Sequence, residues 1–347
     1  MTAPRIEIDL AAFRHNVATL SSLVAPSRTM LAVKANAYGH GLVPLAFAAL
    51  ESGADSLAVL EIPAALELRR AGITAPLFAW LHGPGADFAA AVDAGIDLGV
   101  SATWQVEAIA AAAHSVPARI HLKVDTGLHR NGANPEDWPA LVDAALAAER
   151  AGRVEISALW SHLADASPED DAAALTLFQE SVAVAAARGC TPPLLHLAAS
   201  SAGIRMPAAR LGLVRFGIAA YGISPFDDET ARDLGLRPVM SVRAPVAAVD
   251  GGVASLSIGS ADGIPAPAAG RAQAWVAGSR HPIVEIGIDS LSLDVAGSTV
   301  AVGDEVVLFG SGDDGEPTAE EWADWADTIG DEIVARASER LPRVYRG

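Results

Sequence analysis

From residue 29 onward, short apolar runs alternate with longer stretches in which apolar residues recur at helical spacing. Eight strands are expected, over residues 29–33, 56–59, 76–79, 97–100, 119–124, 154–160, 194–197 and 213–216. The helices expected between them cover residues 42–52, 62–71, 85–94, 103–113, 135–151, 170–188 and 201–208. Eight β–α units of this length predict a (β/α)8 barrel of the TIM type.

The alternative to the barrel is an open, doubly wound sheet. The count of eight units favours the barrel, and no Gly-x-Gly-x-x-Gly fingerprint follows the first of these strands. Upstream of the repeat, residues 5–9 alternate apolar and charged positions and predict one more strand. A helix is expected over residues 10–23, with Asp9 as its N-cap.

The pattern changes after about residue 235, where short strand-like segments punctuated by Gly, Pro and Asp replace the helical stretches. These strands are expected over residues 239–249, 253–258, 273–276, 281–286, 290–293 and 305–309. Residues 320–338 then predict one or two helices. We therefore expect a barrel over residues 1–235 and a C-terminal, mainly antiparallel β domain with a terminal helix over residues 236–347.

Composition excludes several classes of protein. The chain has 347 residues and a net charge of −18, which argues against nucleic acid or an anionic membrane as a partner. The single cysteine, Cys190, excludes an intrachain disulfide framework and a metal site built from cysteines. The N-terminus does not resemble a signal peptide, and no apolar run is long enough to span a membrane, so a cytoplasmic location is expected.

The first barrel strand runs directly into Lys34, which a Gly-rich turn follows. In barrels the C-terminal ends of the strands carry the active site. Of the 24 basic residues only Lys34 and Lys123 are lysines. Arginine does not lose its proton in a protein, whereas a lysine amine can lose it and form a Schiff base. The pattern therefore favours a chemical role for Lys34 over that of a surface lysine.

Further polar residues occur at the ends of later strands: Lys123, Asp125, Thr126, His129, Arg130, His162, His196, Ser200, Ser201, Arg215 and Tyr221. His196 lies within an apolar strand, which is more typical of a core histidine than of a catalyst. His162 fits either role, and Asp125 is also suited to capping a turn before Gly127. Arg215 interrupts an apolar strand, and a buried arginine requires an acceptor, for which a ligand nitrogen or a carboxylate would serve.

Five motifs occur in a characteristic order: AVKANAYGHG, HLKVDTGLHRNG, WSHLADA, HLAASSA and VRFGIAAYG. Together they resemble the alanine racemase family of fold-type III pyridoxal 5'-phosphate (PLP) enzymes, over nearly the whole chain. The resemblance implies a barrel plus a β domain, PLP as cofactor, a small amino acid as substrate and a head-to-tail homodimer. The implied activity is the interconversion of L- and D-alanine.

The resemblance also implies roles for individual residues. Lys34 matches the lysine that forms the internal aldimine and moves the Cα proton on one face. Four matches imply phosphate binding: Tyr38, Ser200 and, through their backbone, Gly217 and Ile218. His162 is implied to pack beside the pyridine ring, and Arg130 to contact the cofactor's phenolic oxygen and the substrate. Lys123 matches a lysine that is often carbamylated, and a carbamate there would hold Arg130 in place.

Arg215 matches the arginine that faces the pyridine nitrogen. Since an arginine does not give up its proton, the ring nitrogen stays unprotonated and the cofactor is a weaker electron sink. This electronic setting suits racemisation better than transamination.

The chain departs from the family pattern in its β domain. The family carries a long hairpin whose tyrosine, supplied by the partner subunit, acts as the second acid/base. Here Val249 passes to Val253 through the tight turn Asp250-Gly251-Gly252. The expected tyrosines of two further motifs are replaced by Ser260 and Glu339, and the methionine expected near the substrate is Ile288.

Losing one positioned acid/base typically costs about 10²–10⁴-fold in rate. Four residues are candidates to replace it: Tyr345, Glu339, Asp262 and His281. Three hypotheses remain open. The chain is a PLP-dependent alanine racemase, a PLP-dependent enzyme that acts on one face of another amino acid, or a PLP-binding homologue with little catalysis.

Overall fold

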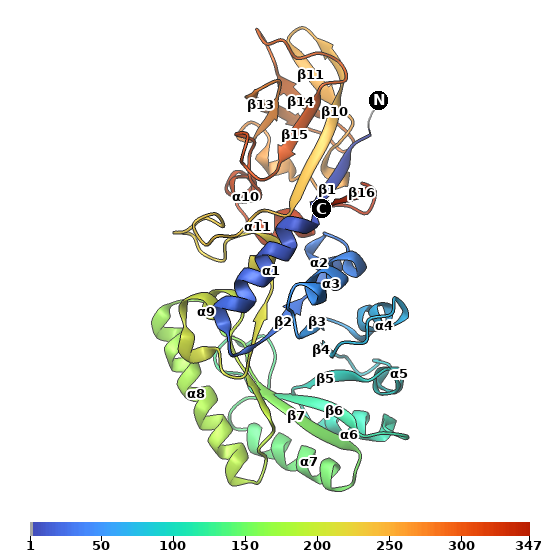
Figure 1. Ribbon diagram of the computed structural model, residues 1–347, viewed down its shortest axis with the longest axis vertical. Coiled ribbons are helices and arrows are strands. Elements are labelled where there is room, and N and C mark those ends of the chain that lie inside the picture. Colours follow the sequence, from blue (N-terminus) through green and yellow to red (C-terminus); the bar gives the residue numbers. More distant parts are fainter. Residues whose placement is uncertain (1–2) are drawn as a thin grey trace. The chain divides into compact units, whose positions relative to one another are not determined.

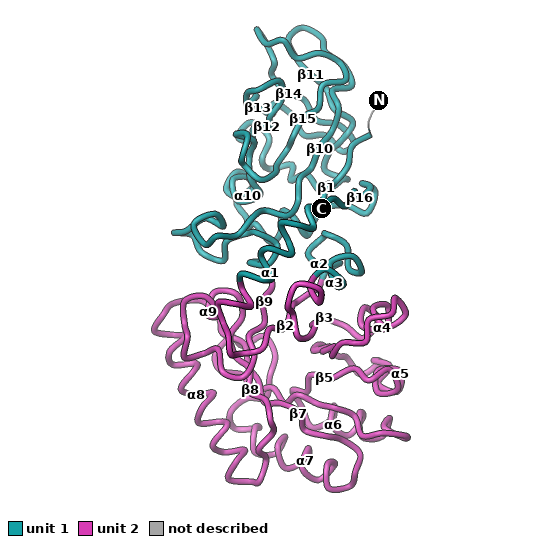
Figure 2. Tube along the Cα trace, in the orientation of Figure 1, with its two compact units in different colours: residues 1–19, 35–48, 218–347 teal, residues 20–34, 49–217 magenta. Residues whose placement is uncertain are grey.

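The computed structural model describes residues 3–347 and divides the chain into two compact units (Figure 2). The barrel unit consists of residues 20–34 and 49–217. The β-domain unit consists of residues 1–19, 35–48 and 218–347. No helix in the described part of the chain is both long and apolar enough to cross a membrane.

The barrel unit contains a parallel sheet of eight strands in the order β8-β7-β6-β5-β4-β3-β2-β9 (Figure 1). Its strands are β2 (Arg28–Ala32), β3 (Ser56–Val59), β4 (Leu77–Ala79), β5 (Ile96–Val100), β6 (Ala118–Lys123), β7 (Val154–Trp160), β8 (Leu194–His196) and β9 (Leu213–Phe216). The amide of Gly212 donates to the carbonyl of Leu195 at 3.2 Å, which joins the β8 and β9 edges and closes the sheet. The (β/α)8 barrel expected from the sequence is confirmed.

Ala- and Leu-rich helices connect the strands: α1 (Leu10–Val24), α2 (Lys34–Tyr38), α3 (Leu42–Glu51), α4 (Ile62–Arg70), α5 (Phe88–Asp93), α6 (Thr103–Ala112), α7 (Trp138–Arg150), α8 (Pro168–Ala187) and α9 (Ser200–Arg205). The predicted N-cap of α1 is present, because the Asp9 carboxylate accepts the amide of Ala12 at 2.8 Å. Ser167 caps α8 in the same way, accepting the amide of Asp170 at 3.1 Å. Short 3-10 turns follow α9 at Pro207–Ala209 and β9 at Ile218–Tyr221.

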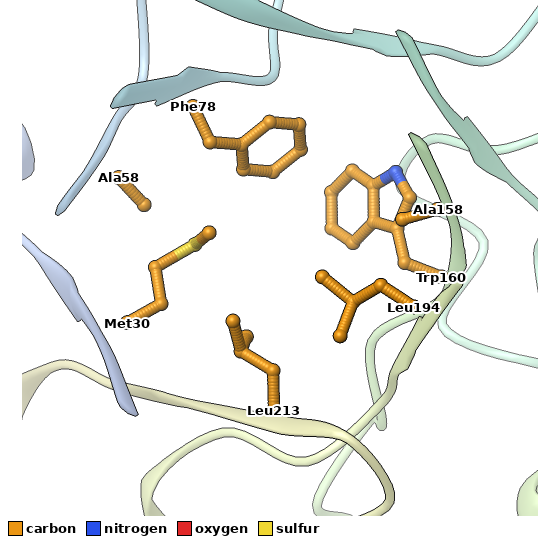
Figure 3. Close-up of a cluster of buried hydrophobic side chains, with 7 residues drawn as sticks. All are labelled: Met30, Ala58, Phe78, Ala158, Trp160, Leu194 and Leu213. Atoms are coloured by element: carbon orange, nitrogen blue, oxygen red, sulfur yellow. The ribbon is translucent and has the colours of Figure 1, made fainter. Parts of the chain in front are cut away.

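The core of the barrel is a cluster of inward-pointing apolar side chains (Figure 3): Met30, Ala58, Phe78, Ala158, Trp160, Leu194 and Leu213. Each comes from a strand and is at most 9% exposed. Phe78 and Trp160 meet edge to face with their ring centroids 5.2 Å apart. Two large aromatic rings thus lie in the apolar core of the barrel. The polar residues of the predicted site lie at or near the ends of the strands that form this core.

The β-domain unit contains a second eight-stranded sheet, mainly antiparallel, in the order β11-β14-β13-β12-β15-β10-β1-β16. Its strands are β1 (Arg5–Asp9), β10 (Met240–Asp250), β11 (Val253–Leu256), β12 (Gln273–Val276), β13 (Ser279–Ile286), β14 (Leu291–Asp294), β15 (Glu305–Phe309) and β16 (Arg343–Arg346). Helices α10 (Ala319–Ala326) and α11 (Gly330–Ala335) precede β16. The expected β domain with terminal helices is confirmed, and β16 is a strand that the sequence pattern did not predict.

The tight turn expected between residues 249 and 253 is present as a hairpin between β10 and β11. Asp250 pairs with Val253, and the two intervening residues, Gly251 and Gly252, have φ angles of +55° and +83°. A two-residue loop with both φ angles positive is the turn that joins twisted antiparallel strands most directly, and glycine adopts it without strain. The hairpin therefore has no room for an inserted loop. The domain boundary placed between residues 235 and 236 stays a prediction.

Candidate active site

Arg215 is a buried cation among the polar residues at the predicted strand ends. It lies in β9 and is only 7% exposed. One guanidinium nitrogen donates to Nδ1 of His196 at 2.9 Å, and the other donates to the backbone carbonyls of Ser161 and Leu197, both at 2.8 Å. The second nitrogen also lies 3.1 Å from Nδ1 of His162. The acceptor that a buried arginine requires is thus supplied by the protein itself.

No carboxylate pairs with Arg215 anywhere in residues 3–347. Burial lowers the pKa of Arg215 to about 9, so the guanidinium is still charged at neutral pH. A buried cation without an anionic partner is costly unless a ligand supplies one or the surrounding dipoles compensate. The contacts of Arg215 with two histidine nitrogens and two carbonyl oxygens provide that dipolar compensation.

The pKa of His162 is lowered by burial and by the positive charges near it. Burial lowers its pKa well below the ordinary value, and four cations lower it further: Arg215, Arg130, Lys123 and Lys34. A neutral His162 accepts from Arg215 and does not compete with it as a second cation. Three cations, Arg215, Arg130 and Lys34, and the partly protonated Lys123 act on one neutral ring in a chain of net charge −18, and they form a local positive potential suited to an anionic ligand.

Lys123, at the end of β6, is 3% exposed, and its amine donates to Oδ1 of Asn131. The amine also lies 4.7 Å from the centre of the Trp160 ring. Burial, and then the charges of Arg215 and Arg130, lower the pKa of Lys123 to about 7. A lysine with a pKa this low has a neutral, nucleophilic fraction at neutral pH.

Asp125 has the turn-capping role that the sequence offered as one of two interpretations. Its Oδ1 accepts the backbone amides of Gly127 at 3.0 Å and His129 at 3.2 Å. Gly132 closes the same loop, because a Cβ there would stand 2.7 Å from the amide nitrogen of Asp125. Arg130 lies within this loop and is exposed.

Ser200 and Gly217 meet where α9 begins and β9 ends. The buried Ser200 hydroxyl accepts the amide of Gly217 at 3.1 Å. Ser200 is the first residue of α9, and the residue after Gly217, Ile218, begins the next 3-10 turn. Backbone amides that open helical turns in this way are donors suited to phosphate oxygens.

Lys34 is half-buried and stands at the end of β2, where the backbone changes hand. The four residues after it, Ala35 to Tyr38, all have φ angles between +49° and +55°. A left-handed conformation costs about 1–2 kcal/mol for each non-glycine residue. Such strain is stored where the surrounding structure holds the backbone in place, and it is common at functional sites.

Within the β-domain unit, the C-terminal segment holds this left-handed turn. Arg343 donates to the carbonyl of Gly39 at 2.7 Å, and the Tyr345 hydroxyl donates to the carbonyl of His40 at 3.2 Å. Nδ1 of the buried His40 donates back to the carbonyl of Tyr38 at 2.8 Å. The Tyr38 ring in turn packs 4.8 Å from the ring of Tyr221. Every backbone carbonyl from Tyr38 to His40 thus has a partner.

The three substituted positions of the β domain are more exposed to solvent than the buried residues of the barrel site. Ser260 is half-buried, Glu339 is exposed and Ile288 is 71% exposed. Their loops are fixed by backbone bonds, since the amide of Ser260 donates to the carbonyl of Gly287 and the amide of Ala261 to that of Ile288, both at 2.9 Å. The side chains therefore contribute little to the fold of these loops.

Three of the four candidates for a second acid/base already have structural partners in the β-domain unit. The hydroxyl of Tyr345 donates to His40, as described above, and the buried Asp262 carboxylate accepts the amide of Gly259 at 3.0 Å. The ring of His281 lies between the Ser279 hydroxyl at 3.0 Å and the carbonyl of Asp294 at 3.1 Å. Glu339 is the candidate whose side chain is exposed.

Sequence reasoning missed three residues that contact predicted ones, namely Asn131, Trp160 and His121, and it also missed Asp97, which contacts His121. A signal existed for His121. It stands two positions before Lys123 in the same strand, and alternate residues of a strand point to the same side.

Comparison with known proteins identifies the same two regions. The alanine racemase N-terminal domain model matches residues 8–225, and the alanine racemase C-terminal domain model matches residues 242–345. The alanine racemase of Thermobifida fusca is 43% identical to this chain over 365 aligned positions, covering 98% of this chain and 97% of the relative. That of Beutenbergia cavernae is 42% identical and covers 100% and 99%.

Solved structures agree. The alanine racemase from D-cycloserine-producing Streptomyces lavendulae superposes with a TM-score of 0.96 at 41% identity, covering 100% of this chain and 98% of that one. The Bacillus anthracis alanine racemase with bound L-Ala-P has a TM-score of 0.90 at 29% identity, covering 100% and 96%. With both family models matched and these identities held over nearly the whole chain, the protein belongs to the alanine racemase family, as its motifs predicted.

Proposed function

We propose that this protein is a PLP-dependent racemase that interconverts L- and D-alanine, with Lys34 as the amine that holds the cofactor. The observation that carries the proposal is the group of cations in the barrel unit: Lys34, Lys123, Arg130 and the carboxylate-free, buried Arg215 around the neutral His162. Such a group suits a ligand with several negative charges, as PLP and an amino-acid carboxylate have.

Each functional group of PLP has a residue of matching chemistry in this chain. Lys34 would hold the aldehyde carbon and Arg215 would face the ring nitrogen, while His162 would lie beside the ring. The phosphate would be held by Tyr38, Ser200 and the backbone of Gly217 and Ile218, and Arg130 would reach the phenolic oxygen. When bound, PLP supplies an electron sink for the charge left when Cα loses its proton.

Arg215 limits that electron sink. Its guanidinium keeps its proton at neutral pH and is held by four acceptors of the protein. A donor that does not release its proton leaves a facing ring nitrogen unprotonated, which weakens delocalisation into the ring. Arg215 thereby favours return of the proton to Cα, as racemisation requires, over transamination.

Lys34 moves the Cα proton on one face, and Arg130 and Ile288 would contact the substrate. On the other face, Glu339 is the candidate acid/base whose side chain makes no hydrogen bond or ion pair within residues 3–347. Lys123, with a pKa near 7, has a neutral fraction able to add CO₂. Its nitrogen would form the new N–C bond and lose a proton, and the resulting carbamate would hold Arg130 in place. A head-to-tail homodimer and a cytoplasmic location complete the proposal.

A second candidate function is a PLP-dependent reaction on one face of an amino acid, with slow or no racemisation. The observation that favours it is the two-glycine turn between β10 and β11, together with Ser260, Ile288 and Glu339. None of these positions offers the tyrosine hydroxyl that the family uses as its second acid/base. In its limiting form this candidate is a PLP-binding protein with little catalysis.

The experiment is incubation of the purified protein and PLP with L-alanine in D₂O, with chirality and Cα deuterium measured together. A racemase gives D-alanine labelled at Cα. A one-face enzyme gives L-alanine that is labelled at Cα and keeps its chirality. The proposed racemase function is wrong if deuterium enters without inversion. Absence of both label and inversion, across a panel of D- and L-amino acids, supports a binding role alone.

A further inference from the structure

A line of polar side chains crosses the barrel interior and ends at Arg215. Asp97 of β5 lies 3.3 Å from Nε2 of His121 of β6. Nδ1 of His121 lies 3.1 Å from Nε2 of His196 of β8. Nδ1 of His196 then lies 2.9 Å from the guanidinium of Arg215 in β9. Four strands contribute one member each, so the line forms only when the barrel closes.

The proton positions along this line follow from Arg215. A guanidinium only donates, so Nδ1 of His196 accepts and its proton resides on Nε2. That proton is donated to Nδ1 of His121, whose own proton then resides on Nε2 and points to Asp97. Every proton is therefore directed away from Arg215 and towards one carboxylate.

The surroundings fix both histidines. His121 is 2% exposed and stacks on Phe78 with ring centroids 4.5 Å apart. His196 is fully buried and stacks on Trp160 at 5.4 Å. Burial, followed by the charge of Arg215, lowers the pKa of His196 well below its usual value, in agreement with a neutral ring.

The far end of the line is anchored as an anion. Oδ1 of Asp97 accepts from Arg119 at 2.5 Å, and Arg119 also donates to the carbonyl of Gly95 at 3.0 Å. Burial alone would raise the pKa of Asp97, but the contacts with His121 and Arg119 outweigh it and lower the pKa. The line thus runs from a fixed carboxylate to a fixed guanidinium.

We propose that Asp97, His121 and His196 are positioning residues for Arg215, which hold its guanidinium in one orientation as a donor to the ring nitrogen of PLP. This inference rests on the proposed function, because it takes PLP as the ligand that Arg215 faces. The three residues would act through Arg215 and not through contact with the cofactor. They act by fixing His196, one of the two histidine acceptors of Arg215, in the tautomer that accepts from the guanidinium.

The test is ¹⁵N NMR of the histidine rings in the PLP-loaded protein, for the wild type and for Asp97→Asn. In the wild type, His121 and His196 are each expected to carry a proton on Nε2, and His196 is expected to stay neutral because its pKa lies well below the usual value. In Asp97→Asn, His121 no longer faces an anion, so the His121 ring is expected to show mixed tautomers and its hydrogen bond with His196 is expected to weaken. The loss of one such anchored contact is expected to weaken PLP binding by about 2- to 10-fold, measured by titration of cofactor absorbance.

The matched control is Glu149→Gln, also a carboxylate-to-amide change in the barrel unit. Glu149 accepts the amide of Ile156 at 2.8 Å and has no contact with the line. The control is expected to leave both the tautomers and PLP affinity unchanged. A second variant, His121→Phe, keeps a ring beside Phe78 but cannot pass on a proton, and it serves if Asp97→Asn fails to fold.

The inference is overturned if His196 carries its proton on Nδ1 or titrates normally in the wild type. It is also overturned if Asp97→Asn and His121→Phe change tautomers and PLP affinity no more than Glu149→Gln does. These outcomes differ from failure of the proposed function, in which the wild type binds PLP but does not racemise alanine. A wild type that does not bind PLP overturns both.

Discussion

The residues predicted to have chemical roles differ in burial between the barrel unit and the β-domain unit. In the barrel, Arg215, His196 and Lys123 are buried, and each has a defined partner. In the β domain, the substituted positions Ile288 and Glu339 are exposed, and backbone bonds hold the loop that carries Ile288.

This difference teaches where the chain tolerates change. Replacing a buried polar residue leaves its partner unsatisfied, which costs about 1–3 kcal/mol, whereas surface substitutions usually change stability by less than about 0.5 kcal/mol. The buried residues that we propose to bind the cofactor are therefore constrained by the fold. The residues that would set the second acid/base and the substrate range are free to diverge, and in this chain they have diverged.

The largest expected effect is that of Lys34→Ala. The variant loses the amine proposed to hold PLP and to move the Cα proton, so racemisation is expected to fall by at least about 10²–10⁴-fold. Reduction with borohydride followed by peptide mapping is expected to label the peptide containing residue 34 in the wild type only. Lys123→Gln is the control, since it changes the only other lysine. Labelling of the Lys34→Ala protein would refute the assignment.

A second prediction concerns the left-handed turn. Gly39→Ala places a Cβ 2.2 Å from the carbonyl oxygen of Val334, at a φ of +81°. The conformational cost and the clash together are expected to lower the free energy of unfolding by about 2–5 kcal/mol, measured by urea denaturation. Gly72→Ala is the matched control. It has a φ of +95° with nothing within 4 Å, so only the conformational cost of about 1–2 kcal/mol applies. Equal losses in the two variants would show that packing around Gly39 is unimportant.

A third prediction compares the contribution to stability of Arg343, in the C-terminal segment, with that of an exposed surface arginine. Arg343→Met keeps an apolar stem but removes the donors to Gly39 and Ala337, and is expected to cost about 1–3 kcal/mol of stability. Arg336→Met removes only an exposed ion pair with Glu332 at 3.2 Å and is expected to cost less than about 1 kcal/mol. Thermal denaturation of both variants makes the comparison, which fails if Arg336→Met is the less stable of the two.

The smallest expected effect is a pH dependence from Lys123. Its folded pKa of about 7 lies below the ordinary value of 10.5, so the unfolded chain binds more protons between these values. Stability due to this group therefore rises with pH, by roughly 1 kcal/mol between about pH 6 and pH 8. The difference in stability between the wild type and Lys123→Met, measured by urea denaturation across this range, isolates that contribution. A difference that does not change with pH would contradict it.

Periodicity located most of the fold. Strands β3, β7, β9, β12 and β15 begin and end near the residues that their apolar runs indicated. Strand β16 was missed because Arg343 to Arg346 is half polar, and it becomes a strand only by pairing in parallel with β1. The left-handed turn after Lys34 was also missed, since Ala35 to Tyr38 contain no glycine and adopt positive φ angles only under tertiary contacts.

The sequence by itself determined the family, the barrel followed by a β domain, the lysine and arginine proposed to face the cofactor, and the tight turn between residues 249 and 253. These follow from local periodicity, motif spacing and residue chemistry. Only the tertiary structure decided which buried groups meet: the line from Asp97 to Arg215, the amine of Lys123 beside Asn131, and the carbonyls of the left-handed turn held by Arg343 and Tyr345. The physical reason is that hydrogen bonds between side chains of different strands depend on barrel closure and register, which no local pattern encodes.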